Sequence, residues 1–430
     1  MNVLILGSGA REHALAWKLK HQGECHHIWL FPGNAGTRLE GFSHFPEHLS
    51  REELVIQAHR DSIGLVVIGP ESFLELGYAD CFRKAGIAVV GPNREAAQLE
   101  TSKIFAKHFL VEAGIPTAPF QIFESEAALL KSPHPDHTPW VLKLDGLASG
   151  KGVVITHSKK EVEAFARAVW KDHLFGTSNQ RVLAEDFLPG REISYIGFCD
   201  GRSFIPLATA TDHKRVFDAD QGPNTGGMGA ISPSPYVHAE LEKTIHQRIV
   251  DPLLQNIQKR QLDFRGVLFL GLMIDEHHQP RVLEINTRMG DPETQAVLPR
   301  LTSSLLQLLQ ATATGDLQRI PLPEWDARHS VYVVACAQGY PQAPQLGQRI
   351  TGTGQLSKEA FLFFGGVGQE QNELVTRGGR VLGVGAMAET LAAARDKAYQ
   401  YLKPIHWPGI HYRFDIGNQL KPAQLPRSSA

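Results

Sequence analysis

Glu284 and Asn286 are the most informative chemical pair in the sequence. One apolar residue, Ile285, separates them in a run that predicts a strand. Because side chains alternate between the two faces of a strand, the pair is expected to point to the same side. Carboxylate and amide oxygens suit magnesium, which keeps phosphates and waters as its other ligands. The pair predicts a magnesium site beside a nucleotide, and two polar residues on a solvated strand face are the competing interpretation.

The residues that follow this pair favour a site for a carboxylate. Arg288 is followed by the segment 290–293, Gly-Asp-Pro-Glu. Asp291 is expected to cap a helix that has Pro292 at its first position. A guanidinium beside a helix N-terminus is a suitable seat for a carboxylate. We therefore expect a carboxylate substrate next to the metal.

The glycine-rich segment 146–152 and the preceding Lys143 offer backbone N–H groups and ammonium groups to phosphate oxygens. The segment is not a Walker A loop, because Asp145 stands where that motif needs its first Gly and Gly152 stands where it needs Ser or Thr. It lies between two expected strands, which favours a flexible cover over phosphates. A plain hairpin turn is the alternative.

Two further features fit a nucleotide site. Glu185 and Phe187 lie at the end of an expected strand, and Glu192 lies on the next one. Such a strand-to-strand hinge can offer backbone groups to an adenine edge while Glu192 reaches a ribose hydroxyl, although an acidic hairpin is an equally simple interpretation. Lys103, near the start of a helix expected over 102–113, is either a further phosphate ligand or a surface lysine.

Three loops can contribute to an anion site. Gly9 lies in a turn that opens a helix, so that backbone N–H groups can face a phosphate. NAD is not expected, because Glu12 stands in place of the third glycine of the dinucleotide fingerprint. The segments 211–215 and 222–229 can bring cations and backbone amides to a substrate anion. Turns without a ligand are the alternative for all three. The spacing His-Pro-Asp-His at 134–137 lies in a Pro-rich loop, and zinc is not expected there.

Composition describes a soluble multidomain enzyme. The length of 430 residues predicts about three domains. A formal net charge of -2 provides no field that would recruit nucleic acid or an anionic membrane. The four cysteines form no C-x-x-C pair, and no signal peptide or membrane-spanning run is found, so a cytoplasmic protein is expected.

The elements that must position these residues fall into α/β and α+β domains. Residues 1–101 have short apolar runs at 3–6, 28–31, 65–68 and 87–90, separated by helical patterns, which is typical of a doubly wound parallel sheet. Residues 102–325 are expected to form a second domain, with a lid of about 118–190 and an α+β core. Residues 326–430 predict a small, mostly β domain.

Arrayed in this order, the motifs resemble the ATP-grasp ligases, and among them the glycinamide ribonucleotide synthetase family. The resemblance covers essentially the whole chain and is carried by LGSGAREHALAW, PGNAGT, IGPE, GPNREAAQLETSK, KLDGLASGKGVVI, EDFLPGREISY, TDHKRVFDADQGPNTGGMGA, GLMID, LEINTRMGDPETQ, TRGGRVLGV and YRFDIG. It implies ATP-dependent joining of glycine to 5-phosphoribosylamine through a glycyl phosphate, in purine synthesis. A related ATP-grasp ligase with a different amine or amino acid is the alternative. A monomer or weak homo-oligomer is expected, with no nucleic acid or membrane partner.

The resemblance also implies the roles of individual residues. ATP would be held by Lys103, Lys143, Gly146, Ser149, Gly150, Lys151, Gly152, Glu185, Phe187 and Glu192. Magnesium or manganese would be held by Glu284 and Asn286. Substrates would be lined by Gly9, Asn34, Glu71, Asp212, Lys214, Asn224, Thr225, Gly226, Arg288 and Asp291. Catalysis would depend on Arg288, Lys143 and Asp212 through positioning and charge neutralisation.

The sequence departs from the family pattern at three places. Phe73 lies in a segment where a small residue and Pro are usual, Met289 replaces Phe, and Phe364 to Val367 replace a His-Ala-Gly-Thr-like segment. Phe73 and Val367 are expected near the sugar-phosphate side, so these departures bear on the amine substrate more than on ATP.

Overall fold

The structure is a computed structural model, and it describes residues 1–133, 139–147, 152–174, 180–354 and 359–418. The first domain has the predicted parallel sheet, in the order β3-β2-β1-β4-β5. Its strands are β1 (Asn2–Gly7), β2 (His27–Pro32), β3 (Ser43–His44), β4 (Ile63–Ile68) and β5 (Ala88–Val90). Its helices are α1 (Ala10–Gln22), α2 (Ala35–Leu39), α3 (Arg51–Arg60), α4 (Glu71–Glu75), α5 (Tyr78–Lys84) and α6 (Gln98–Thr101).

The lid is a four-stranded antiparallel sheet in the order β6-β9-β7-β8, with two helices. Its helix α9 begins after Ser158, whose side chain accepts a hydrogen bond from the Glu161 backbone N–H, and its buried residues form one stripe. This small core belongs to the lid alone. The lid elements are β6 (Phe120–Phe123), α8 (Glu126–Lys131), β7 (Trp140–Leu144), β8 (Val153–Thr156), α9 (Lys159–Trp170) and β9 (Val182–Asp186).

The core sheet has the order β11-β10-β16-β17 and carries Glu284 and Asn286, the predicted metal pair, on its edge strand β17. The long helix expected after residue 239 is present, with a π-helical segment, η2, between α10 and α11. The elements are α7 (Lys103–Glu112), β10 (Arg191–Cys199), β11 (Phe204–Pro206), α10 (Ala239–Ile245), η2 (His246–Val250), α11 (Asp251–Lys259), β16 (Gly266–Ile274) and β17 (Pro280–Asn286).

The last sheet combines C-terminal strands with two strands from the middle of the chain. Its order is β12-β15-β18-β22-β19, and β15 pairs with β18. The strands β12 and β15 therefore belong to the C-terminal sheet, which β15 joins by pairing with β18. The elements are β12 (Thr211–Asp212), β15 (Gly229–Ser232), β18 (His329–Cys336), β19 (Ala360–Phe364), β22 (Arg380–Ala388) and α14 (Leu391–Leu402), with the hairpins β13 (Arg215–Phe217)–β14 (Gln221–Asn224) and β20 (Val367–Glu370)–β21 (Glu373–Thr376).

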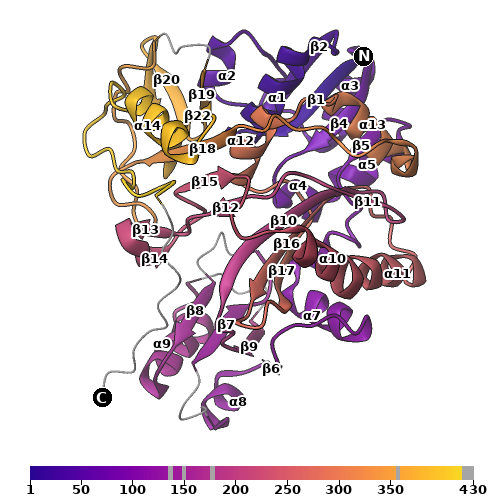
Figure 1. Cartoon of the computed structure of the whole chain (residues 1–430), viewed down its shortest axis with the longest axis vertical. Helices are drawn as coiled ribbons and strands as arrows, with labels where there is room; N and C mark the ends of the chain where they lie inside the picture. The colour runs from indigo at the N-terminus through magenta and orange to yellow at the C-terminus, as the bar shows by residue number, and fades with distance from the viewer. Residues whose placement is uncertain (134–138, 148–151, 175–179, 355–358, 419–430) are drawn as a thin grey trace.

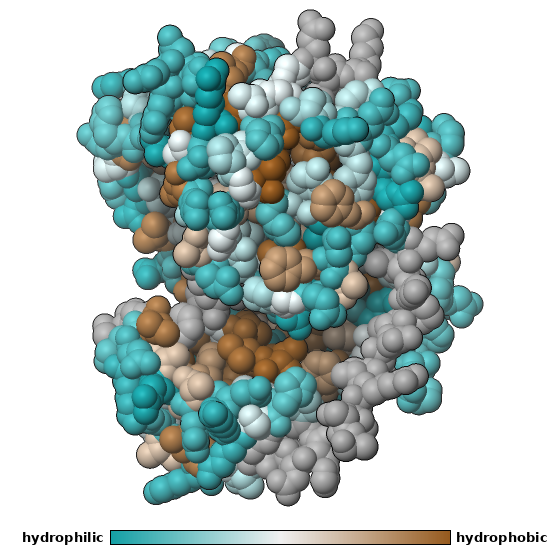
Figure 2. Space-filling model, turned by 90° about the vertical axis from the view of Figure 1, so that its left-hand side faces the viewer, coloured by the Kyte–Doolittle hydropathy of each residue, from teal (hydrophilic) through white to brown (hydrophobic). Residues whose placement is uncertain are grey.

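Figure 1 shows how these parts are arranged. The lid lies at one end of the molecule, and the core strands β10, β16 and β17 lie between it and the two other domains. The connecting elements α12 (Glu293–Val297), η3 (Leu298–Arg300), α13 (Leu305–Thr314) and η4 (Leu317–Arg319) return the chain along the first domain. Figure 2 shows a hollow across the surface above the lid, with apolar side chains gathered along its lower side. No described helix combines the length and the apolar run that crossing a bilayer requires.

Candidate active site

The side chains of Glu284 and Asn286 lie on one face of β17, as the period-two pattern predicts. Ile285 between them is buried, whereas the Glu284 side chain is 45% exposed. Opposite them, a shift of register follows Gly271 of β16. A Cβ atom at Gly271 would lie 2.9 Å from Glu284 Cγ, so glycine at this position makes room for the carboxylate.

These two residues fit the ligand set that magnesium takes at a phosphate. The Asn286 amide donates to Glu284 Oε1 at 3.5 Å, so the two oxygen-bearing groups adjoin. The charge of Lys214 is the main reason that the pKa of Glu284 is lowered to about 2, although burial acts to raise it. The carboxylate is therefore charged at neutral pH. The described residues contain no cluster of three or more His, Cys, Asp or Glu side chains suited to a metal. Two protein ligands leave positions for phosphates and water.

Lys214 lies between Glu284 and Glu192. Its Nζ is 3.7 Å from Glu284 Oε1 and donates a hydrogen bond to Glu192 Oε1. Burial acts to lower the pKa of Lys214, but the surrounding carboxylates outweigh burial and raise it. Glu192, predicted to contact ribose, and Lys214, predicted to contact substrate, therefore form an ion pair with each other close to Glu284.

Lys103 and Lys143 reach the nucleotide side of the core from the first core helix and from the lid. Lys103 Nζ donates to the Gly146 carbonyl at 2.8 Å. Lys143 Nζ donates to the Leu283 carbonyl at 3.1 Å and lies 3.0 Å from Glu185 Oε1. Four predicted ATP residues thus form two pairs, Lys103 with Gly146 and Lys143 with Glu185, and Lys143 also contacts the strand that bears Glu284.

The beginning of the glycine-rich segment is anchored by Asp145, which sequence reasoning did not select. Its carboxylate accepts hydrogen bonds from Ser102 Oγ at 3.0 Å and from Arg181 at 2.7 Å. Gly146 follows with a φ of 97°, a conformation that favours glycine. Ser149, Gly150 and Lys151 lie outside the described residues, as does the whole spacing considered for zinc, residues 134–137. Gly152 is buried beside β8.

The strand-to-strand hinge is present where the sequence predicted it. Glu185 lies at the end of β9, and β10 begins at Arg191. The Phe187 N–H donates to the Pro139 carbonyl at 3.1 Å, which holds the hinge against the lid. Glu185 itself is buried, and its carboxylate points to lysines, including Lys107. Lys107 is four residues after Lys103, a spacing that places both on one helix face and could have revealed it.

Arg288 is held between two carboxylates. Its Nε donates to Glu71 at 3.0 Å, and its Nη2 lies 3.1 Å from Glu100 Oε1. Glu100 also accepts hydrogen bonds from the N–H and hydroxyl of Thr287, and burial raises its pKa. Burial acts to raise the pKa of Glu71 also, but Arg288 and Arg11 outweigh it and lower the pKa to about 2. Glu100 was not selected from the sequence.

The predicted cap at Asp291 is wrong. The N-cap position belongs to Pro292, and helix α12 begins at Glu293. Asp291 instead accepts hydrogen bonds from Gln295 at 2.7 Å and from Arg380 at 2.7 Å. Burial acts to raise the pKa of Asp291, but Arg380, Arg11 and the hydrogen bond from Gln295 together lower it. The Asp291 carboxylate therefore binds Arg380, 89 residues away in the chain, instead of capping the helix that follows it.

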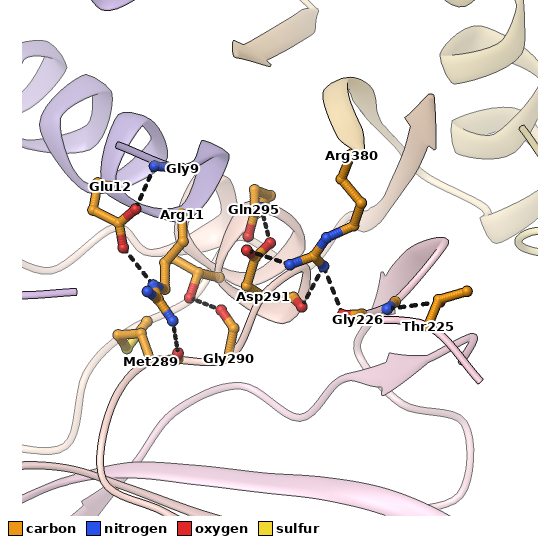
Figure 3. A network of polar contacts seen from close by, with 12 residues as sticks. Gly9, Arg11, Glu12, Thr225, Gly226, Met289, Gly290, Asp291, Gln295 and Arg380 are labelled. Atoms are coloured by element: carbon orange, nitrogen blue, oxygen red, sulfur yellow. Dashed lines mark hydrogen bonds and ion pairs between the residues drawn. The ribbon is translucent and has the colours of Figure 1, made fainter. Parts of the chain in front are cut away.

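Arg380 connects three parts of the site, as Figure 3 shows. Besides Asp291, its guanidinium donates to the Gly226 carbonyl at 2.6 Å. The Thr225 side chain holds the same loop by donating to the Lys214 carbonyl at 2.8 Å. Arg380 lies in the segment TRGGRVLGV, where no local pattern singles it out. The loop that holds the predicted substrate residues Asn224, Thr225 and Gly226 is thereby fastened to the C-terminal sheet.

Asp212 lies beside this loop with one oxygen unsatisfied. Its Oδ1 is buried and lacks a hydrogen-bond partner among the described residues. A Cβ atom at Gly227 would lie 2.7 Å from that oxygen, so the backbone approaches it closely. Burial and the nearby Glu293 raise the pKa of Asp212 well above its usual value. The group is an acceptor when charged and a donor when protonated.

The turn at Gly9 borders a cavity between the domains. The Gly9 N–H was expected to face a phosphate, but it donates a hydrogen bond to Glu12 Oε2 at 2.7 Å. Glu12 is the residue that replaces the third glycine of the dinucleotide fingerprint. Arg11 connects the same helix to the Met289 carbonyl at 3.1 Å. The cavity measures about 190 Å³, and its lining includes Gly9, Ala10, Asp291, Gly365, Gly366 and Arg380.

Asn34 uses its amide within the protein. Its Oδ1 accepts from the Thr37 N–H at 3.0 Å, and its Nδ2 donates to the carbonyls of Ser8 and Phe364 at 2.8 and 2.9 Å. The Phe364 N–H donates to His13 Nδ1 at 3.0 Å. Two side chains of the first domain thus hold both backbone groups of one C-terminal residue, beside the cavity.

The departures from the family pattern have different surroundings. Phe73 is half-buried and packs edge-on against Tyr78, with ring centroids 4.7 Å apart. Val367 is buried in the C-terminal core, and its expected position near the sugar-phosphate side stays a prediction. Met289 is buried, and its carbonyl accepts from both Arg11 and Arg288.

The chain matches known proteins over nearly its whole length. Models of the phosphoribosylglycinamide synthetase N domain, ATP-grasp (A) domain and C domain match residues 1–100, 101–294 and 330–419. Phosphoribosylamine–glycine ligase of Xanthomonas axonopodis pv. citri is 43% identical over 420 residues, which are 97% of each chain. The Vibrio cholerae protein of the same name is 42% identical and covers 97% of this chain and 98% of its own.

Solved structures agree. The crystal structure of phosphoribosylamine–glycine ligase from Thermotoga maritima superimposes with a TM-score of 0.83 at 36% identity, covering 97% of this chain and 100% of that one. Biotin carboxylase from Campylobacter jejuni gives a TM-score of 0.73 at 15% identity over 95% and 92% of the two chains, which shows likeness of fold alone.

Proposed function

This chain belongs to the phosphoribosylglycinamide synthetase family, and we propose that it joins glycine to 5-phosphoribosylamine while ATP is converted to ADP and phosphate. The observation that supports this most strongly is the grouping around β17. Lys143 contacts the strand at the Leu283 carbonyl, the oxygen pair lies at Glu284 and Asn286, and Arg288 follows two residues later. Groups for phosphate, metal and carboxylate thus succeed one another along six residues of chain.

The reaction proceeds in two displacements. A carboxylate oxygen of glycine attacks the γ-phosphorus of ATP, and ADP leaves. The amine nitrogen of phosphoribosylamine then attacks the carbonyl carbon of glycyl phosphate, and phosphate leaves with the oxygen that came from glycine. No residue of the protein forms a covalent bond in either step, so catalysis depends on positioning and charge neutralisation.

On the nucleotide side, Lys103 and Lys143 neutralise phosphate oxygens, together with Gly146, Ser149, Gly150, Lys151 and Gly152. Glu185, Phe187 and Glu192 surround adenine and ribose. Glu284 and Asn286 hold the divalent ion, magnesium or manganese. When bound, the ion polarises a phosphoryl oxygen and offsets the charge of the phosphates. The low pKa of Glu284 keeps this carboxylate ionised before nucleotide binds.

On the acceptor side, Arg288 and Asp291 orient glycine, and Asp212, Lys214 and the loop 224–226 meet the amine substrate near Gly9 and Glu71. Arg288 can turn one guanidinium edge to a carboxylate while Glu71 and Glu100 hold its other donors. Asn34 lines the same side and also holds the backbone of Phe364, through the hydrogen bonds that its amide makes within the protein.

The test is release of ADP from MgATP in the presence of glycine, 5-phosphoribosylamine or both. We expect rapid release only with both, and formation of glycinamide ribonucleotide in equal amount. ATP turnover that ignores the amine would contradict the proposal. A panel of other amino acids and amines, tested in the same assay, measures how far Phe73 and Met289 have changed specificity.

A further inference from the structure

Lys107 is a buried lysine that has no role in the proposed reaction as described above. It lies on α7, and its side chain is 3% exposed. Its Nζ lies 3.4 Å from Glu185 Oε1 and donates a hydrogen bond to Thr117 Oγ1. Burial lowers the pKa of Lys107 to about 8, against the opposing charge of Glu185. Burying a lysine ammonium group lowers the stability of the fold, so its presence here suggests that its charge has a role.

Glu185 has two cations on one oxygen. Lys143 Nζ lies 3.0 Å from the same Oε1 that Lys107 approaches. Lys143 and Glu185 belong to neighbouring lid strands, β7 and β9. In this arrangement the ammonium that is proposed to hold a nucleotide phosphate is engaged with an acid. It must leave Glu185, at least in part, before it can serve ATP.

Release of Lys143 is costly if Glu185 has no other partner. Glu185 is buried, and a buried carboxylate that loses its cation is strongly destabilised. Lys107 removes that difficulty because it is fixed to the core instead of the lid. Thr117, to which it donates, in turn donates to the Val282 carbonyl of β17 at 2.7 Å. Its position is therefore set by the helix α7 and by the core strand.

We propose that Lys107 is a positioning residue, which neutralises Glu185 so that Lys143 can turn to the nucleotide phosphates. This inference rests on the proposed function, since it assumes that ATP binds beside Lys143. Without Lys107, Glu185 keeps Lys143 as its counter-ion, and the phosphates compete with a buried carboxylate for one ammonium. A purely structural role for Lys107 would affect folding without a specific link to Glu185.

The experiment compares Lys107→Met, Glu185→Gln and the double variant. The measurement is the dissociation constant of adenylyl imidodiphosphate with magnesium, by titration calorimetry of the full chain, alongside thermal unfolding. Lys18→Met is the matched control, because Lys18 is also buried and its pKa is also lowered to about 8 by burial, but it lies on α1. It should bind the analogue as the wild type does.

We expect Lys107→Met to weaken binding about tenfold or more, the effect of losing one charged contact to phosphate. Glu185→Gln no longer retains Lys143, but it also alters a residue proposed to lie beside adenine, so its own affinity for the analogue is the reference for the double variant. The double variant should regain the affinity of Glu185→Gln. If Lys107→Met does not fold, Glu185→Gln and the double variant still decide the question.

Unchanged affinity in Lys107→Met, or a double variant that binds the analogue about tenfold more weakly than Glu185→Gln, would overturn the inference. In each of these cases the wild type still binds the analogue, so the proposed function stands. A wild-type chain that binds no analogue would instead contradict the proposed function, and the inference would fall with it.

Discussion

The lysines on the nucleotide side and the arginines on the acceptor side are held in different ways. Lys103 has one carbonyl partner, and Lys143 has one carbonyl and one carboxylate oxygen. Arg288 bonds to two carboxylates and a carbonyl, and Arg380 to one carboxylate and two carbonyls. The lysines have few partners, whereas the arginines are fastened on several sides.

This difference follows from the two side chains. A lysine ammonium is a point charge on a flexible stem, and it can exchange one oxygen for another with little change of geometry. A guanidinium is a planar fork whose donors are fixed relative to one another. The nucleotide side is therefore suited to exchange partners when ATP binds, and the acceptor side is suited to keep three domains in register.

The largest effect is expected where the lysines meet the metal pair. Glu284→Ala should lower turnover by about a thousandfold or more, because the ion loses its charged ligand. The free energy of unfolding should change by less than about 1 kcal/mol, since the side chain is 45% exposed. ADP release and urea unfolding measure the two quantities. Glu276→Ala, at an 86% exposed carboxylate, is the matched control and should change neither.

The next largest effect is a difference in the free energy of unfolding between an arginine variant and a lysine variant. Arg288→Met leaves Glu71 and Glu100 without their shared partner, and should lower the free energy of unfolding by about 3–5 kcal/mol. Lys143→Met should cost less than about 1 kcal/mol, because Lys107 remains beside Glu185. Urea titration at pH 7 compares them. Equal losses in the two variants would break the comparison.

Arg380→Lys keeps the positive charge but replaces the planar guanidinium group and its several fixed donors with a single ammonium group. Contacts to Asp291 and Gly226 cannot all be kept by one ammonium, so we expect a loss of about 1–3 kcal/mol in unfolding free energy. The KM for the amine should rise, while the KM for ATP should stay constant. Arg377→Lys, at a half-exposed arginine three residues earlier, provides the control. A rise in both KM values would contradict a role confined to the acceptor side.

The smallest effect concerns pH. The pKa of Lys107 is lowered in the folded state, so the unfolded chain binds more protons than the folded chain above pH 8. Stability that depends on this group therefore rises as pH rises. Between pH 8 and 9 the wild type should gain about 1 kcal/mol relative to Lys107→Met. Urea unfolding of both proteins at pH 7, 8 and 9 gives the difference, and a flat difference would refute the shift.

The features that sequence analysis predicted correctly depend on local pattern. Short apolar runs separated by helices predicted the parallel sheet, and alternation along β17 placed Glu284 and Asn286 on one face. The family resemblance supplied the order of the parts, including the lid and the C-terminal sheet. Domain bounds and the roles of individual site residues stay predictions.

The features that it missed depend on partners far away in the chain. Glu100 and Arg380 matter because they meet Arg288 and Asp291 across 188 and 89 positions, and no local spacing announces such pairs. The same long-range contact explains why Asp291 is not a cap. Only Lys107 carried a local signal, since it follows Lys103 by one helical turn.

The most direct test of the account is the path of oxygen. Glycine labelled with ¹⁸O in its carboxylate is supplied with ATP, magnesium and phosphoribosylamine, and the released phosphate is analysed by mass spectrometry. If the carboxylate attacks the γ-phosphorus, each phosphate carries one labelled oxygen, and the ligated product retains the other. Unlabelled phosphate, formed while glycinamide ribonucleotide accumulates, would contradict activation of glycine as an acyl phosphate.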